Sequence, residues 1–235
     1  TDAVDCPYRG LAPFAERDYD YFFGRSKDAS QLAAATITES LSVLFGPSGV
    51  GKSSVLGAAL PRALHAIIDG TLMVYVSRWE PGFYPTLLAQ ARERAGLADP
   101  AAATSLEALA ERWIAAKSTP VVFVFDQFEQ YFLIPLKAEN QDEGIEPAFE
   151  VDLARTANRR DLDSHVLISI REDALHELER LRGRLPAILG DPMRLDYLDE
   201  PAARAAICKP LEVFRERHGD AAGPVEIETE LAGEL

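Results

Sequence analysis

Residues 41–54 read Leu-Ser-Val-Leu-Phe-Gly-Pro-Ser-Gly-Val-Gly-Lys-Ser-Ser, and this stretch decides the fold. The apolar residues 41–45 predict a short buried strand, and the apolar residues 55–60 predict a helix. Between them, residues 46–53 match G-x-x-x-x-G-K-S, the phosphate-binding loop known as the P-loop. The strand before the loop and the helix after it supply the structural context that the motif requires.

The spacing of the P-loop follows from the chemistry of binding phosphate. A loop that wraps phosphate groups points successive backbone N–H groups inward, and the helix that follows adds the positive end of its dipole. We expect Lys52 to lie between the β- and γ-phosphates, and the Ser53 hydroxyl to take one position on Mg²⁺. The predicted nucleotide-binding residues of the loop are Gly46, Pro47, Ser48, Gly49, Val50, Gly51, Lys52, Ser53 and Ser54.

Length and composition describe an ordinary globular chain. It has 235 residues, of which 47% are hydrophobic, so it can bury a full core. A net charge of −14 argues against a general nucleic-acid or anionic-membrane surface, and no apolar run reaches the roughly 20 residues of a membrane span. Two distant cysteines, Cys6 and Cys208, favour a reduced, cytoplasmic setting. The chain starts at Thr1 rather than Met, so we expect a piece of a longer protein.

Strand and helix patterns alternate along the chain, which predicts a three-layer α/β/α domain with a mostly parallel sheet. Thr104 and Glu107 form a capping-box pattern before one helix, and Pro210 is expected to interrupt another. One further strand is expected between the P-loop strand and the acidic strand described next. Strands are predicted at 72–77, 121–125, 165–170 and 193–198, and helices at 28–38, 55–68, 85–95, 106–114, 147–160, 172–182 and 199–207, with a surface loop at 137–146.

An acidic residue follows the most apolar strand pattern of the chain. Residues 121–125 read Val-Val-Phe-Val-Phe, as in a parallel strand covered on both faces, and Asp126 comes next. A carboxylate there is expected to hold Mg²⁺, directly or through water, opposite Ser53. Glu129 is a candidate to polarise the attacking water, or it is a helix-start glutamate facing solvent.

Arg171 ends the next predicted strand, so it belongs to the same edge of the sheet as the P-loop and Asp126. From there its guanidinium could reach the γ-phosphate and report its presence. The alternative is an ion pair with the neighbouring Glu172 or Asp173.

The chain divides into three predicted parts. Residues 1–25 form an aromatic strap, which either packs against the domain or also lines a base pocket through Phe23, Gly24 and Arg25. Residues 26–199 form the P-loop core. Residues 200–235 form the start of a helical lid.

Five segments taken together resemble the novel STAND NTPases, signalling ATPases related to the AAA+ and apoptotic-ATPase branch. The resemblance implies ATP or ADP with Mg²⁺ as ligands, and a base contacted near Phe23, Gly24 and Arg25. It also implies effector and sensor domains on the same longer chain, a role in defence, and self-association when ATP replaces ADP. The segments are Cys-Pro-Tyr-Arg-Gly-Leu-Ala-Pro-Phe at 6–14, Phe-Phe-Gly-Arg at 22–25, the P-loop at 46–54, Phe-Asp-Gln-Phe-Glu at 125–129 and Ile-Arg-Glu-Asp at 170–173.

One residue departs from the pattern of the wider class, which often has glutamate directly after the strand aspartate. Here Gln127 takes that place, and the nearest acid is Glu129. Hydrolysis is therefore expected to be slow or absent. Three alternatives to a regulatory ATPase remain: an ATP-gated scaffold that does not hydrolyse, a small-molecule kinase, and an AAA+-type DNA-handling ATPase.

Overall fold

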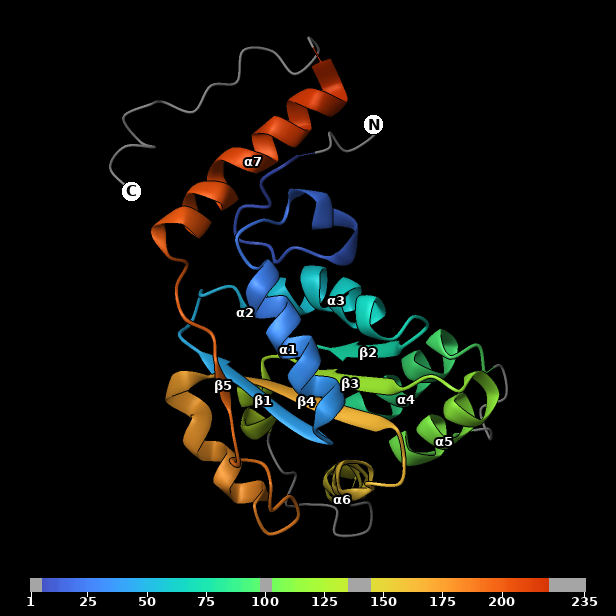
Figure 1. Ribbon diagram of the computed structural model, residues 1–235. Coiled ribbons are helices and arrows are strands. Elements are labelled where there is room, and N and C mark those ends of the chain that lie inside the picture. Colours follow the sequence, from blue (N-terminus) through green and yellow to red (C-terminus); the bar gives the residue numbers. More distant parts are fainter. Residues whose placement is uncertain (1–5, 98–102, 135–144, 220–235) are drawn as a thin grey trace.

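The computed structural model describes residues 6–97, 103–134 and 145–219, and a parallel five-stranded sheet forms its centre (Figure 1). The strands lie in the order β2-β3-β4-β1-β5. This architecture confirms the predicted α/β fold class. The strands are β1 (Leu41–Gly46), β2 (Leu72–Val76), β3 (Val121–Phe125), β4 (Ser164–Arg171) and β5 (Met193–Arg194).

Helices cover both faces of the sheet, so its central strands are buried on both sides (Figure 1). In β3 the side chains alternate: Phe123 and Phe125 pack toward α4, α5 and α6, whereas Val122 and Val124 pack toward α1 and α3. The helices are α1 (Ser26–Thr38), α2 (Lys52–Ser54), α3 (Leu60–Ile67), α4 (Phe83–Arg94), α5 (Leu106–Lys117), α6 (Ile145–Asn158) and α7 (Glu200–His218), with short helices η1 (Glu16–Tyr21), η2 (Val55–Ala59), η4 (Phe128–Leu133) and η5 (Glu172–Leu181).

One strand does separate the P-loop strand β1 from the acidic strand β3, but it is β4; the strand predicted at 72–77 is β2, which lies at the edge of the sheet. The register pairs Gly46 on β1 with Arg171 on β4, and Phe125 on β3 with Ile168 on β4. All these strands are parallel, so their carboxyl ends meet at one edge of the sheet. The first P-loop residue, Asp126 and Arg171 therefore belong to the same edge.

The helix after the P-loop is divided by Pro61. It begins as α2, widens into a π-helical turn over η2, and continues as α3 with Pro61 in its first turn. Proline has no N–H, and its ring clashes with the carbonyl four residues earlier, so regular α-helical bonding cannot pass through this position. The helix predicted at 55–68 is therefore present, with its change of hydrogen bonding just before Pro61.

Two local predictions were wrong. The helix cap before α5 is Ser105, whose hydroxyl accepts a hydrogen bond from the Ala108 N–H, so Thr104 and Glu107 do not form the capping box. Pro210 does not interrupt the last helix: α7 runs from Glu200 to His218 with Pro210 buried inside it. The predicted strand at 193–198 is shortened to β5, and the predicted loop at 137–146 lies largely outside the described residues.

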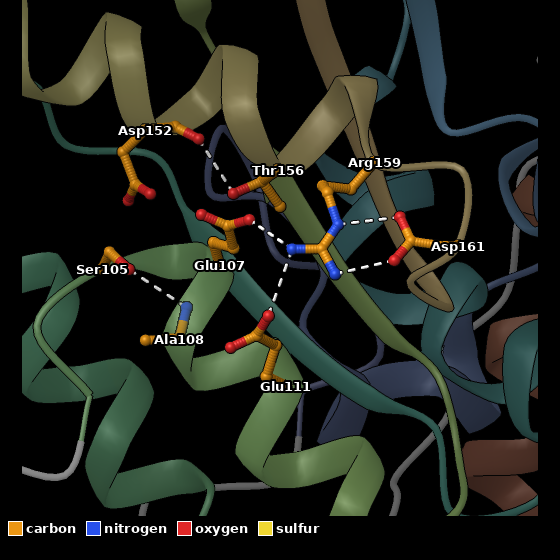
Figure 2. A network of polar contacts seen from close by, with 8 residues as sticks. All are labelled: Ser105, Glu107, Ala108, Glu111, Asp152, Thr156, Arg159 and Asp161. Atoms are coloured by element: carbon orange, nitrogen blue, oxygen red, sulfur yellow. Dashed lines mark hydrogen bonds and ion pairs between the residues drawn. The ribbon is translucent and has the colours of Figure 1, made fainter.

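Glu107 instead joins a polar network on the face of α5 and α6 (Figure 2). The guanidinium of Arg159 contacts Glu107 at 2.6 Å, Glu111 at 3.1 Å and Asp161 at 2.8 Å. The network ties α5 to the turn after α6. Its charges are partly exposed, so its contribution to stability is modest.

The N-terminal strap, residues 6–25, lies between the P-loop helix and α7. On one side the Phe14 N–H donates to the Ser54 hydroxyl at 3.3 Å. On the other side the Tyr8 hydroxyl donates to the Ile207 carbonyl at 2.6 Å, and Asp20 pairs with Arg217. The strap therefore links the P-loop helix to the C-terminal helix.

Within the described residues, no helix has both the length and the apolar character needed to cross a bilayer.

Gly24 is a position where the backbone of the strap lies close to the backbone of α7. Its backbone is left-handed, with φ +87°, and a Cβ there would lie 2.6 Å from the Ala202 carbonyl oxygen. We expect Gly24→Ala to destabilise the domain by about 1–2 kcal/mol from the backbone alone, and by about 1–3 kcal/mol more from the overlap. Thermal unfolding measures the loss.

Gly82→Ala is the matched control. Gly82 has φ +80°, but a Cβ there would meet nothing within 4 Å. This variant should carry only the backbone cost. Equal losses for the two variants would contradict the contact between Gly24 and α7.

Candidate functional site

The P-loop has the open shape that its glycines permit. Gly49 and Gly51 are left-handed, with φ +77° and +100°, a conformation that other residues rarely adopt. Gly46 is required for a different reason: a Cβ there would lie 2.5 Å from the Leu195 carbonyl oxygen. The Leu195 N–H donates to the Phe45 carbonyl at 2.8 Å, which holds the segment after β5 against the P-loop strand.

The Lys52 side chain folds over the P-loop. Its ammonium donates to the carbonyl oxygens of Gly46 at 2.8 Å and Pro47 at 2.9 Å. Burial lowers the pKa of Lys52 below its usual value, and the carboxylates of Glu129 and then Asp126 act in the opposite direction. The Lys52 ammonium is thus close enough to Glu129 and Asp126 to interact electrostatically with both carboxylates.

Arg25 holds the backbone of the P-loop through a hydrogen bond to Val50. Its buried guanidinium donates to the Val50 carbonyl at 2.8 Å and to Asp28 at 2.8 Å, so it holds loop backbone. Arg25 and Gly24 also line a cavity of about 770 Å³ between α1 and the segment joining β5 to α7. Phe23 lies toward α7, where the Lys209 ammonium is 5.7 Å from its ring centroid.

The two serines after Lys52 point to different neighbours. The Ser54 hydroxyl accepts the hydrogen bond from Phe14, so it contacts the strap. Ser53 lines a second cavity, of about 320 Å³, together with Tyr75 of β2 and Phe14 of the strap. Sequence alone had grouped Ser53 and Ser54 with the nucleotide-binding residues without distinguishing these environments.

Asp126 is fully buried at the end of β3. Its Oδ1 accepts from the Ser169 hydroxyl at 2.8 Å and from the Gln127 N–H at 2.9 Å, and its Oδ2 accepts from the Tyr75 hydroxyl at 2.7 Å. Burial, and then the Asp126 carboxylate, raise the pKa of Tyr75 far above its usual value. The Trp79 indole donates to the Asp126 carbonyl at 2.8 Å, which fixes the backbone as well.

This donor set fits a magnesium ion. A carboxylate offers about four acceptor positions, and the described residues use three of those on Asp126, leaving one on Oδ2. Magnesium keeps several waters and binds proteins through one or two carboxylates together with substrate phosphates. One oxygen position on Asp126 and the hydroxyl of Ser53 are ligands of the kind that magnesium uses in this way.

Glu129, rather than Gln127, lies toward Lys52 and β4. Gln127 is left-handed, with φ +54°, and its side chain accepts a hydrogen bond from the Gln130 amide at 2.6 Å. The Glu129 carboxylate accepts the Arg171 backbone N–H at 3.2 Å. Among the carboxylates that raise the pKa of Lys52, Glu129 acts most strongly. The acid nearest to Lys52 after β3 is thus Glu129, two residues beyond the position where the wider class has glutamate.

The Arg171 guanidinium is paired with Asp173 in this structure, at 2.9 Å to Oδ1 and 2.5 Å to Oδ2. That ion pair raises the pKa of Arg171 and lowers the pKa of Asp173. Glu172, the other partner considered, contacts Arg194 instead. Arg171 is exposed at the same edge as Lys52, and Arg171 in turn lowers the pKa of Lys52.

The sheet thus brings Lys52, Asp126, Glu129 and Arg171 to one edge; their chemical roles stay predictions. Sequence reasoning missed Tyr75, Ser169 and Trp79, which hold Asp126. Ser169 did carry a signal, because a hydroxyl inside the apolar strand 166–170 needs a buried partner. Tyr75 carried none, since an aromatic residue is ordinary in a strand.

A parallel sheet with a P-loop after β1, an acid after β3 and β4 between them defines a P-loop NTPase domain. The sequence matches the family model Novel STAND NTPase 1 over residues 7–221. The chain therefore belongs to this family, which confirms the resemblance found from its motifs. None of the curated proteins matches the sequence.

Solved structures with a similar fold include proteins of Aeropyrum pernix and Pyrococcus abyssi. The ORC1 protein of Aeropyrum pernix in complex with DNA is 17% identical, with a TM-score of 0.54 over 83% of this chain and 50% of that one. The ORC2 protein of the same organism, in its ADPNP-ADP complexes, is 14% identical, with a TM-score of 0.59 over 88% of this chain and 55% of that one. A Walker-type ATPase of Pyrococcus abyssi is 14% identical, with a TM-score of 0.53 over 96% and 65%. The chain spans about half the length of the two ORC structures.

Proposed function

We propose that this domain binds ATP with Mg²⁺ at the P-loop, hydrolyses it slowly, and serves as the switch of a larger signalling protein. One arrangement carries the proposal: Lys52, Asp126, Glu129 and Arg171 share one edge of the sheet, and each of the other three affects the pKa of Lys52. A cation, a buried carboxylate, a partly buried carboxylate and a guanidinium around a phosphate-binding loop suit phosphoryl transfer to water.

Each residue has a defined part in the proposed mechanism. The Lys52 ammonium exchanges the carbonyls of Gly46 and Pro47 for phosphate oxygens when the nucleotide binds. Ser53 and Asp126 would hold a magnesium ion, and the bound ion would supply positive charge beside the phosphates. Arg171 leaves Asp173 to contact the γ-phosphate. That contact distinguishes ATP from ADP, because a ligand shifts a conformational equilibrium only through contacts that differ between states.

The base is proposed to lie in the 770 Å³ cavity beside Gly24 and Arg25. The cavity is bordered by α1 on one side and by the segment leading to α7 on the other, so a bound base would contact both the core and the lid. Occupancy would then influence the position of α7. This proposal extends the predicted role of the strap, in which Phe23, Gly24 and Arg25 contribute to the base site.

Glu129→Gln tests whether Glu129 orients and activates the attacking water. We expect phosphate release to fall about 100-fold, the lower range for loss of a general base, while nucleotide binding stays nearly unchanged. Glu177→Gln is the matched control, since Glu177 is also partly buried but lies on η5 and contacts Arg180. Equal rates for Glu129→Gln and wild type would contradict the role of Glu129.

A scaffold that binds ATP without hydrolysing it is the second candidate. It is favoured by Gln127, which replaces the acid expected directly after Asp126 and whose side chain is bonded to Gln130. Measurements on the wild-type protein alone can distinguish the hydrolysing switch from the scaffold. ATP binding without phosphate release, even at concentrations where the protein self-associates, would favour the scaffold.

The remaining features of the switch concern the longer protein. Effector and sensor domains, defence signalling and ATP-dependent self-association are proposed for the whole protein on the resemblance to the STAND NTPases, since this chain spans only about half of the ORC structures. One neighbour was solved with DNA, but a net charge of −14 gives this chain no general attraction to nucleic acid. We therefore do not extend DNA binding to this domain.

A further inference from the structure

The carboxylate of Asp126 is held from two sides by different strands. Ser169 comes from β4, the neighbour of β3 toward the P-loop, and donates to Oδ1. Tyr75 comes from β2, the neighbour on the opposite side, and donates to Oδ2. The Gln127 N–H adds a second bond to Oδ1. Oδ1 is therefore saturated, and Oδ2 carries the remaining acceptor position.

Tyr75 is the only one of these donors that contacts the oxygen left for a metal, within the part of the chain that the structure describes. It also lines the cavity of about 320 Å³ that contains Ser53. Tyr75 thus contacts Asp126 and borders the same cavity as Ser53, the other residue assigned to magnesium. A carboxylate turns about its last single bond, and removal of the Tyr75 hydroxyl would remove the described hydrogen bond that holds Oδ2 against that rotation.

We propose that Tyr75 is a positioning residue for the magnesium ion, because its hydroxyl fixes Asp126 so that the free position on Oδ2 is presented toward Ser53. The inference rests on the proposed function, since it assigns a metal-orienting role within the same site. Groups that hydrogen-bond to a metal ligand typically contribute 10- to 100-fold to metal affinity. Tyr75 acts on the ion through Asp126 and not on the reaction itself.

The test uses nucleotide binding rather than turnover. The dissociation constant for ADP is measured by calorimetry with excess Mg²⁺ and again with EDTA. The value in EDTA divided by the value in Mg²⁺, here called the magnesium ratio, reports how much magnesium strengthens binding. We expect Tyr75→Phe to reduce that ratio by about tenfold. Binding in EDTA should stay close to the wild-type value, because Tyr75 contacts the magnesium ligand and not the loop.

Tyr84→Phe is the matched control. Tyr84 is also largely buried, and its hydroxyl donates to a buried carboxylate, that of Asp152 on α6. Its removal should lower thermal stability but leave the magnesium ratio unchanged. Ser169→Ala forms a second arm, which loosens the same Asp126 carboxylate from the β4 side and should also reduce the ratio.

The outcomes separate this inference from the proposed function. A wild-type protein that binds no nucleotide, or binds it without any magnesium effect, overturns both. A clear magnesium effect in the wild type that is unchanged or larger in Tyr75→Phe overturns only the role of Tyr75. A reduced ratio in Tyr84→Phe as well would show a general loss of rigidity and would also overturn it.

Discussion

Lys52→Ala is expected to abolish the thermal protection that ATP or ADP with Mg²⁺ gives the domain, while leaving the fold intact. A ligand that binds only the folded state at 100 times its dissociation constant stabilises by about 2.7 kcal/mol. For a domain of this size that is a rise in melting temperature of roughly 5–10 °C. Without the ammonium, the phosphates lose their charged partner on the loop, and we expect the rise to disappear.

The fold should tolerate this change. Lys52 is half-buried, and its hydrogen bonds go to the backbone of the loop and not to the core. Without nucleotide the melting temperature should therefore stay near the wild-type value. Lys117→Ala serves as the control, since Lys117 is exposed at the end of α5 and should keep full protection. Normal protection in Lys52→Ala would place the nucleotide elsewhere.

Arg171→Ala is expected to remove most of the preference for ATP over ADP while changing ADP affinity little. A hydrogen bond to a charged group contributes about 1.5–3 kcal/mol, which corresponds to a loss of preference of roughly 10- to 100-fold. The guanidinium is free to change partners at low cost. Its ion pair with Asp173 is exposed, and exposed pairs contribute at most about 1 kcal/mol.

Calorimetry with ADP and with a non-hydrolysable ATP analogue, both in excess Mg²⁺, measures the two affinities. Arg182→Ala is the matched control, because Arg182 is another exposed arginine that pairs with a nearby acid, Glu179, and lies outside the proposed base cavity. It should keep the preference of the wild type. Equal losses of both affinities in Arg171→Ala would mean that Arg171 supports the site as a whole and does not sense the γ-phosphate.

The contacts that Arg25 and Gly24 make in the folded chain could not be predicted from the sequence. The sequence pattern singled out Arg25 and Gly24, but it could not separate a contact with the base from a contact with protein. In the folded chain Arg25 holds the Val50 carbonyl, and Gly24 makes room for the Ala202 carbonyl. Both contacts join segments that are distant in the sequence. Local patterns contain no information about such approaches.

The same limit explains the errors at helix ends. Thr104 and Ser105 are both good capping residues, and the choice between them depends on where Glu107 is drawn. In the folded chain Ser105 caps the helix, and the Glu107 carboxylate contacts Arg159 in the turn after α6 (Figure 2). Proline usually ends a helix, so the sequence predicted an interruption at Pro210. In the structure Pro210 is buried and α7 continues through it.

By itself, the sequence determined the strand, loop and helix at residues 41–54, the buried strand ending at Asp126, and the family. These features are encoded in short-range periodicity and in fixed spacings, which need no knowledge of the rest of the chain. Only the tertiary structure decided how Asp126 is held, because Tyr75 and Ser169 lie 51 and 43 residues away along the chain. Partners that far apart meet only when neighbouring strands pair in a particular order and register.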